Sequence, residues 1–503
     1  MSRHLGKFTV IFCCLSLFST TSYGEIPTEK DTTKIYSLPE IIVSEKYQQS
    51  EVRSITPMQI LSARKIENLN ALQVSDAIKY FSGVNVKDYG GIGGLKTVSV
   101  RSFGAEHTAV SYDGITLTDC QTGQIDLGRF SLDNVDMLSL NNGQSDNIFL
   151  PARLFASSSV LNIRTLEPSF EEKEKLKGKI ALKAGSFGLF NPSLLLETKI
   201  NRNFSAIMSG EWLSANGEYP YRLTYGTQKG DSSSTETRKN TDVATLRLEG
   251  TIYANFAQNE SAYLKMYYYE SRRGLPGAVI YYLDENTNHQ RSNDRTFFSQ
   301  AHFEKHFSPL WSFQTNVKYH NGYLHYMDPS YNNSDGKIDN IYLQEEYYFS
   351  ASLLFKAFEK LSFSVSTDYS LNKMEANLQD FAYPKRNTVL SVFNAKYVSN
   401  QWLATAGCLG TIVKESVKKG ETPENRQHVS PFLSFAIQPF EPYDFRFRCF
   451  YKNNFRLPTF NDLYYTYVGN RNLKPENAQQ FNAGITYNFS TERISLFSVT
   501  LDA

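Results

Sequence analysis

Long runs of strict alternation between apolar and polar residues fill most of the chain after residue 176. Between residues 361 and 372, apolar, aromatic and threonine side chains occupy every second position, and serine, aspartate and asparagine occupy the positions between them. A period of two places one kind of side chain on each face of a β-strand. Residues 311–320 and 347–355 repeat the pattern. These runs exceed most strands of soluble proteins and suit tilted strands that cross a bilayer.

The connections between the runs alternate in length. Short turns are predicted near Asn201-Arg202, Ala257–Asn259, Ser308-Pro309, Phe358-Glu359, Ser399-Asn400, Phe440–Pro442 and Ser490-Thr491. Long polar loops lie between them, at about 215–241, 273–293, 327–338, 373–387, 414–426 and 455–477. This order is typical of an up-and-down membrane β-barrel, with short turns at one end and long loops at the other. A large soluble β-sandwich is the alternative, but sandwiches do not segregate loop lengths in this way.

The start of the chain indicates export. Arg3 and Lys7 precede a short apolar stretch, Phe8 to Phe18, and small residues follow at Ser22 and Gly24. This is the three-part pattern of a secretory signal peptide, and its apolar part is too short for a membrane span. We therefore predict a signal peptide over residues 1–24. No later segment holds about 20 consecutive apolar residues, so a membrane protein of this kind would have to span lipid as a β-barrel.

Composition supports this class and argues against others. The chain has 35 Phe and 32 Tyr, and aromatic residues favour strands and form the girdles of outer-membrane barrels. A net charge of +1 argues against nucleic acid as a partner. The three cysteines after the signal, Cys120, Cys408 and Cys449, are too few and too scattered for a disulfide framework.

The amino-acid composition changes near residue 170, which predicts two domains. Residues 25–50 are polar and read as a flexible tail, residues 51–166 as a compact α+β domain, and residues 173–503 as the barrel. Counting hairpins gives roughly 15 barrel strands, the last at about 493–501. Bacterial single-chain barrels have even strand numbers, and plugged transporters have about 22. The expected fold class is therefore mainly β, with an N-terminal α+β domain followed by an antiparallel transmembrane β-barrel. With roughly 15 of about 22 strands this barrel is incomplete, and it would expose an open edge that is not tolerated in lipid.

The α+β region can be assigned element by element. Asn70 is expected to cap a helix over 71–81, and Gly83 to end it. Strands are expected at 84–86, 97–101, 108–112, 115–117, 133–140 and 159–165. Asp113-Gly114 between two of them is a strong turn signal.

At these residues the chain resembles the plug domain of TonB-dependent outer-membrane receptors. The similarity rests on segments 76–78, 83–86, 98–104, 112–115 and 160–165, in that order. Two further segments are similar to family signatures: 455–464 with 469–476 in the barrel, and a TonB box in the tail made of Leu38, Pro39, Glu40, Ile41, Ile42, Val43 and Ser44. A β-prone stretch in a mobile tail can add as a strand to a partner's sheet. The chain departs from the family at Ser102 and at 155–159, where glycines are usual.

The resemblance implies energy-coupled uptake across the outer membrane. The implied partners are TonB with its inner-membrane energising complex, outer-membrane lipid, and a small-molecule ligand, either a corrinoid or an iron chelate, with a lean towards cobalamin-type receptors. Ligand contacts are expected on apical plug loops, at Tyr89, Ile92, Asp119, Gln121, Thr122 and Gln124. Arg101 and Arg164 are expected either to pair with barrel carboxylates and hold the plug, or to be solvated.

Other site chemistries find little support. No nucleophile–base signature is visible, so an enzyme is not expected. The 8 His residues lack metal-ligand spacing, and an acidic loop holding Asp328, Asp335 and Asp339 has Tyr331 where a calcium loop needs its first ligand. Neither a metal nor a cofactor is predicted. Two function classes remain: an uptake receptor represented by an incomplete chain, and a non-transporting surface receptor, adhesin or decayed product with an unclosed barrel.

Overall fold

The computed structural model describes residues 51, 53–226, 232–257, 259–279, 289–440, 444–465, 468–489 and 497–503. The chain divides into two units, Met1–Val43 and Ser44–Ala503, and all described residues belong to the second. The predicted signal peptide and the predicted TonB box, Leu38–Ser44, lie outside the described residues and stay predictions.

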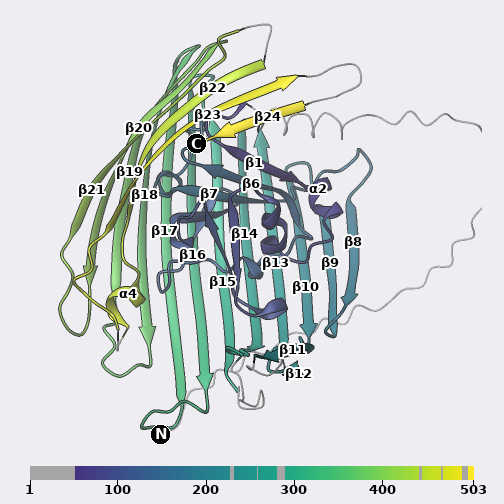
Figure 1. The fold of residues 1–503 in the computed structure, drawn as a ribbon. Helices are drawn as coiled ribbons and strands as arrows, with labels where there is room; N and C mark the ends of the chain where they lie inside the picture. Colours follow the sequence, from purple (N-terminus) through teal and green to yellow (C-terminus); the bar gives the residue numbers. More distant parts are fainter. Residues whose placement is uncertain are drawn as a thin grey trace, which may run out of the picture. The chain divides into compact units, whose positions relative to one another are not determined.

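A small mixed sheet forms the centre of the N-terminal region (Figure 1). Its strand order is β1 (Met58–Ser62), β6 (Val135–Asn142), β7 (Ser159–Thr165), β4 (Thr108–Tyr112) and β5 (Ile115–Leu117). A separate hairpin pairs β2 (Val84–Asp88) with β3 (Lys96–Val100). The helical elements are α2 (Ala63–Asn68), α3 (Val74–Ala77) and the 3-10 turns η1 (Ile78–Tyr80), η2 (Gly91–Gly93), η3 (Ala105–His107), η4 (Leu127–Arg129) and η5 (Ala152–Phe155). We call residues 53–166 the plug.

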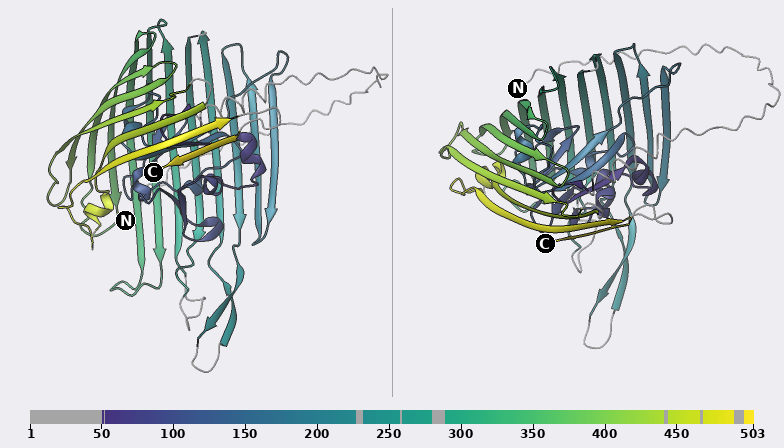
Figure 2. Two further views of the ribbon diagram at one scale, coloured as in Figure 1. Left: turned by 45° about the horizontal axis from the view of Figure 1, so that its top comes forward. Right: turned by 90° about the horizontal axis from the view of Figure 1, so that it is seen from above.

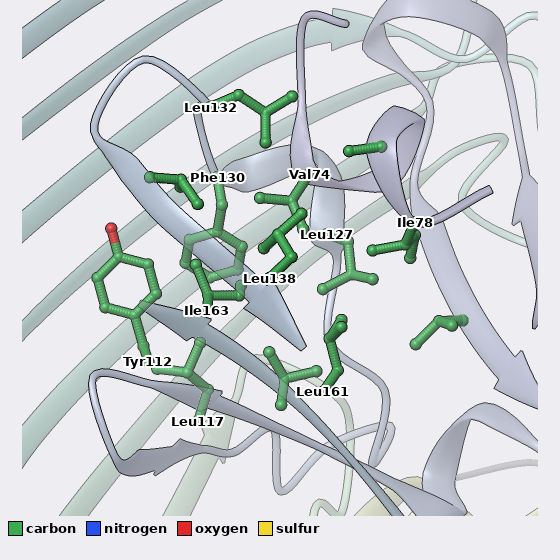
Figure 3. Close-up of a cluster of buried hydrophobic side chains, with 14 of the residues drawn as sticks. Val74, Ile78, Tyr112, Leu117, Leu127, Phe130, Leu132, Leu138, Leu161 and Ile163 are labelled. Carbon is green, nitrogen blue, oxygen red and sulfur yellow. The ribbon is translucent and has the colours of Figure 1, made fainter. Parts of the chain in front are cut away.

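The plug core lies on one face of this sheet. Alternate residues of β6 and β7, such as Leu138, Leu161 and Ile163, point into it and meet side chains from α3 and η4 (Figure 3). The residues between them, such as Ser139 and Asn162, lie on the opposite face, because side chains alternate along a strand. One face of the sheet is therefore mainly apolar. The other, which we call the polar face, carries polar residues together with Ala109 and Val160, which pack against Leu154.

The predicted helix over 71–81 is wrong at its start. Helical structure begins only at Val74, and Asn70 has a positive φ of 48° after the end of α2. Gln73 is extended and forms an isolated bridge with Ser131. This long-range pairing takes the backbone groups that a longer helix would need. The Asp113-Gly114 turn is present as predicted, with φ values of 48° and 83° that suit a two-residue hairpin.

The second sheet contains 15 strands among the described residues, which confirms the predicted count. In chain order they are β8 (Leu176–Gly185), β9 (Leu189–Lys199), β10 (Phe204–Ala215), β13 (Val243–Ala257), β14 (Glu260–Gly274), β15 (Arg291–His306), β16 (Trp311–Asp328), β17 (Ile338–Phe358), β18 (Leu361–Ala376), β19 (Lys385–Val398), β20 (Trp402–Ser416), β21 (Arg426–Ile437), β22 (Asp444–Arg456), β23 (Glu476–Phe489) and β24 (Phe497–Asp502). Each neighbouring pair is antiparallel. In the described part of the chain β8 and β24 each have one strand neighbour, so this sheet is not closed.

Connection lengths define two ends of this sheet. Strands such as β17 and β18 are joined by two residues at one end, which we call the short-turn end. The opposite long-loop end carries the longer connections, including a hairpin of β11 (Tyr219–Tyr225) and β12 (Ser232–Arg238), and the loop with helix α4 (Phe460–Tyr464). The sequence did not predict this hairpin inside the loop at 215–241.

The long strands have two chemically different faces, as their alternation predicts. On β18, Val365 and Tyr369 are exposed, whereas Ser364, Ser366 and Asp368 are buried. The buried face meets the plug: Ser366 donates to the Leu150 carbonyl, and Asp368 accepts hydrogen bonds from the backbone of η5. The sheet curves, and the plug lies on its polar, concave side (Figure 2). No helix in the described part of the chain is long and apolar enough to span a membrane.

Candidate functional site at the plug apex

A cavity of about 530 Å³ lies between the plug and the strands β14–β17, towards the long-loop end. Its plug wall comes mainly from the segment that follows β5, residues 118–126, which we call the apical loop. Its other wall comes from the 15-stranded sheet, which we call the barrel, through inward-facing side chains such as Tyr267, Phe298 and Gln344. Asn461 of α4 and the nearby Tyr465 close one side. The size lies within the usual range for small-molecule sites, about 300–1,000 Å³.

Five of the six predicted ligand residues line this cavity, namely Tyr89, Asp119, Gln121, Thr122 and Gln124. Ile92 is placed elsewhere: it packs against Leu213, Ala215 and Val243 at the barrel wall. The structure thus gathers residues from two plug segments that are thirty positions apart in the sequence. Their role in ligand binding stays a prediction.

Strand β17 holds the apical loop through two inward side chains. The Gln344 amide oxygen accepts a hydrogen bond from the Cys120 backbone at 3.1 Å, and the Gln344 amide nitrogen donates to Asp119 at 3.3 Å. Two positions along the same face, Glu346 accepts a hydrogen bond from the Thr118 hydroxyl at 2.5 Å. Burial raises the pKa of the Cys120 thiol, which therefore stays neutral and lies 3.3 Å from the Gln344 oxygen.

Helix α4 reaches the same loop from the long-loop end. Thr459 and Asp462 form a capping box at its first turn, which satisfies backbone groups that a short helix leaves free. The backbone nitrogens of Phe460 and Asn461 then donate to the carbonyls of Cys120 and Gln121, both at 3.0 Å. The segment 455–464, noted in the sequence only as a family signature, therefore forms part of the cavity wall.

The charged groups that line the cavity balance one another. They are three carboxylates and three guanidinium groups: Asp119, Asp126, Asp294, Arg129, Arg273 and Arg295. Arg273 pairs with Asp294 and lies 3.5 Å from Asp126, and Arg129 lies 3.7 Å from Asp126. Arg295 stacks over the Tyr323 ring at 4.3 Å. The remaining polar lining is mostly amide and phenol, and aromatic rings provide much of the apolar surface.

The two arginines predicted to hold the plug differ in their partners. Arg101 lies 3.8 Å from Asp502 of β24, a barrel carboxylate. Arg164 pairs at 2.5 Å with Asp136, which belongs to the plug's own strand β6.

Other plug–barrel ion pairs are more deeply buried and were not singled out from the sequence. Lys265 of β14 contacts both Asp113 of the plug, at 2.7 Å, and Glu249 of β13. Glu346 contacts Arg153 of η5 and Lys318 of β16, both at 2.7 Å. The sequence showed Lys265, Lys318 and Glu346 only as charged residues on the polar face of an alternating strand. That signal does not distinguish a solvated lumen residue from one that contacts the plug.

Comparison with known proteins agrees with this architecture. The sequence model described as "TonB-dependent Receptor Plug Domain" matches residues 51–150, and the one described as "TonB dependent receptor-like, beta-barrel" matches residues 196–502. The vitamin B12 transporter BtuB of Vibrio vulnificus is 20% identical over 454 residues, which cover 88% of this chain and 67% of the transporter.

Solved structures show the same fold. The Serratia marcescens hemophore receptor HasR, in complex with its hemophore HasA and heme, superimposes with a TM-score of 0.71 at 12% identity, covering 90% of this chain and 73% of the receptor chain. FpvA of P. aeruginosa, bound to a heterologous pyoverdine, gives a TM-score of 0.65 at 12% identity, covering 90% of this chain and 63% of its own. The chain thus spans about two thirds of the length of these proteins. On the plug and barrel matches, the chain belongs to the TonB-dependent receptors, a family of outer-membrane β-barrel proteins with an N-terminal plug.

Proposed function

We propose that this chain acts in energy-coupled uptake of a large ligand of low net charge, either a corrinoid or an iron chelate. The observation that carries the proposal is the apical cavity with its balanced charges. A strongly anionic ferric chelate would be expected to need an excess of positive charge, because buried charges require partners. Three guanidinium groups beside three carboxylates offer no such excess.

The uncharged part of the lining favours a corrinoid. Corrinoids combine a broad apolar ring face with a rim of amide groups. The cavity offers aromatic rings such as Tyr267 and Phe298, and amides such as Gln121, Gln124 and Gln344. Similarity to a vitamin B12 transporter supports the same choice. Aromatic surface with a few placed polar groups is the usual design of a small-molecule site.

The coupling partner in this proposal is TonB with its inner-membrane energising complex. Leu38–Ser44 would add as a strand to TonB once ligand binding makes the tail available. The ligand must bind the two plug states with different affinity for this coupling to work. The proposal includes no catalytic step.

Binding is tested by titrating the purified chain with cyanocobalamin, ferrichrome and ferric enterobactin, which differ in net charge. We expect cyanocobalamin to bind most tightly, and Gln121→Ala to weaken its binding about tenfold through loss of one polar contact. Gln401→Ala, at the short-turn end, is the control and should bind like the parent. Tightest binding of the trianionic ferric enterobactin would show that the charge argument is wrong.

Coupling is tested by deleting Leu38–Ser44 and measuring surface binding and accumulation of radiolabelled cyanocobalamin separately. We expect binding to persist and accumulation to fall to the level of cells that lack TonB. Undiminished accumulation would exclude a coupling role for this segment.

A further inference from the structure

A second cavity, of about 380 Å³, lies on the polar face of the plug sheet. Ser139 and Asn141 of β6 and Asn162 of β7 line it, together with Gln144 from the following loop. Tyr253 of β13 and Tyr263 of β14 supply the barrel wall. Arg164 and Glu167 also line it, where the chain leaves the plug for β8. We call this space the rear cavity.

The plug sheet presents a row of small polar side chains on this face. Ser111 of β4, Asn162 of β7 and Ser139 of β6 lie side by side in register. Asn162 donates to Ser139 at 3.4 Å, and the fully buried Ser111 hydroxyl has no hydrogen-bond partner among the described residues. Buried polar groups are normally satisfied, so such a row indicates a face built to meet water or a polar ligand.

The two cavities adjoin along one strand. Tyr267, Lys265 and Tyr263 are successive inward-facing residues of β14. Tyr267 lines the apical cavity and Tyr263 lines the rear cavity. At about 3.3 Å per residue, roughly 13 Å of strand separates them. Lys265 lies between them.

Lys265 holds the tip of the β4–β5 hairpin at this point. Its ammonium group contacts the Asp113 carboxylate at 2.7 Å and the Thr165 hydroxyl at 2.8 Å, and it is fully buried. Asp113 and the adjacent Gly114 line the rear cavity, whereas Leu117, at the other end of β5, lines the apical cavity. The hairpin therefore stands between the two spaces.

Further contacts fix the same tip. The Tyr112 hydroxyl donates to Glu249 at 2.6 Å, and its ring packs against Phe130 (Figure 3). The same ring packs against Tyr267 and Phe298, and all three rings line the apical cavity. The Tyr263 hydroxyl donates to the Asp113 carbonyl at 2.6 Å. By contrast, the space next to Gly114 is open, with no atom within 4 Å of where a side chain would begin.

We propose that the rear cavity is a second station, meaning a second site that the transported ligand occupies after it leaves the apical cavity. The β4–β5 hairpin tip, held by Lys265, is the partition that separates the two cavities. Movement of this tip alone joins the cavities along the face of β14, while η5 stays bound to β17 and β18. The rear cavity combines hydroxyl and amide groups with apolar side chains such as Met137, Leu150 and Leu154. This mixture suits the same ligand class as the apical cavity, so this inference rests on the proposed function.

The partition is tested with Asn162→Cys as a reporter in a full chain in which Cys120, Cys408 and Cys449 are replaced by Ser. Intact cells are treated with a membrane-impermeant maleimide, and the labelling rate is measured without ligand. We expect Lys265→Met to raise the rate at least about tenfold, because it leaves Asp113 buried without its counter-charge. Lys183→Met is the matched control, since it removes another lysine–plug ion pair, with Asp133, that does not hold the hairpin tip.

A second variant distinguishes release of the hairpin tip from misfolding of the Lys265→Met chain. Asp113→Asn removes the ion pair but retains an oxygen that can accept from the Thr165 backbone. It should also raise the labelling rate above that of Lys183→Met. Equal rates in all three variants would overturn the partition.

The second station is tested by filling it. Asn162→Phe should leave surface binding of cyanocobalamin intact, because the apical cavity is unchanged, and lower its accumulation at least about tenfold. Asn85→Phe, on the exposed face of β2, is the control. Equal accumulation in the two variants would overturn the station. Absence of cyanocobalamin binding to the parent chain would count against the proposed ligand alone, and the labelling rates would still decide whether the hairpin separates the cavities.

Discussion

Glu346 is the residue through which strand β17 holds two separate plug segments. Its buried carboxylate contacts Thr118 at the start of the apical loop, Arg153 of η5, and Lys318 of the neighbouring strand. Glu346→Ala leaves two buried cations without their counter-charge, so we expect a loss of about 3–5 kcal/mol in the free energy of unfolding. Urea unfolding in detergent micelles measures it.

The control for Glu346 is an exposed pair. Glu270 pairs with Arg272, whose side chain is 69% exposed. Glu270→Ala should cost less than about 1 kcal/mol, because solvent screens exposed ion pairs. Similar losses in the two variants would show that the Glu346 cluster does not hold the plug.

Asp133 gives the plug–barrel contact a dependence on pH. Burial acts to raise its pKa, but hydrogen bonds from Lys183 and Ser193 outweigh burial, so the pKa lies below its usual 3.8. A carboxyl whose folded pKa is lowered stabilises the fold above pH 3.8 and loses that contribution as pH falls through the lower value. Asp133→Asn should therefore lower the free energy of unfolding by about 1 kcal/mol at pH 7, a figure reduced for partial exposure.

The same difference should shrink as pH falls below 3.8. Unfolding of the parent and Asp133→Asn is compared at several values between pH 7 and pH 2. In a Lys183→Met background the difference at pH 7 should be smaller, since the main partner is absent. A difference that is constant with pH would contradict the assignment.

Among the elements, helix α4 is short, and its first turn is held by the Thr459 side chain. It has five residues, and the Thr459–Asp462 capping box fixes its first turn against the apical loop. Thr459→Ala should cost about 1 kcal/mol and raise amide hydrogen exchange both in α4 and in residues 118–124. Thr235→Ala, on the exposed strand β12, should change neither. Faster exchange in α4 alone would show that the two segments are not coupled.

The elements also show how far sequence patterns reach. Alternation identified the long strands because strands such as β18 have one face against polar plug atoms and one apolar outer face, as Ser366 and Val365 illustrate. The helix expected at 71–81 was shortened by the Gln73–Ser131 bridge, which joins positions 58 residues apart and which no local pattern encodes.

The candidate site could also be predicted only in part from the sequence. Asp119, Gln121 and Gln124 could be proposed because the resemblance implies ligand contacts on the loops that follow these plug strands, and these residues do line the apical cavity. Ile92 does not line this cavity, because an apolar loop residue is equally suited to pack on a wall, as it does beside Val243. The roles of Lys265 and Glu346 depend on plug partners far away in the sequence, so they required the structure.

At the scale of the molecule, the alternation of each strand adds up to an apolar outer band. Exposed side chains on neighbouring strands include Val317, Phe349, Val365, Phe393 and Ile412. Each has a buried polar residue beside it in sequence, for example Asn316, Ser350 and Ser366. A surface of this kind is stable in hydrocarbon and not in water, which agrees with membership of an outer-membrane family.

This band predicts that the cost of a charge depends on its depth. Val365 lies inside β18, between the aromatic residues Phe363 and Tyr369, whereas Tyr397, on the outer face of β19, is the second-last residue of that strand at the short-turn end. Val365→Arg should lower the free energy of unfolding in phospholipid vesicles by about 2–4 kcal/mol, because the guanidinium group would face hydrocarbon. Tyr397→Arg should cost no more than about 1 kcal/mol, since the arginine side chain can reach the interface. Both residues lie on the outer face and are similarly exposed, at 49% and 43%, so the two substitutions differ mainly in depth. Equal costs in vesicles would mean that lipid does not cover this face as the alternation requires.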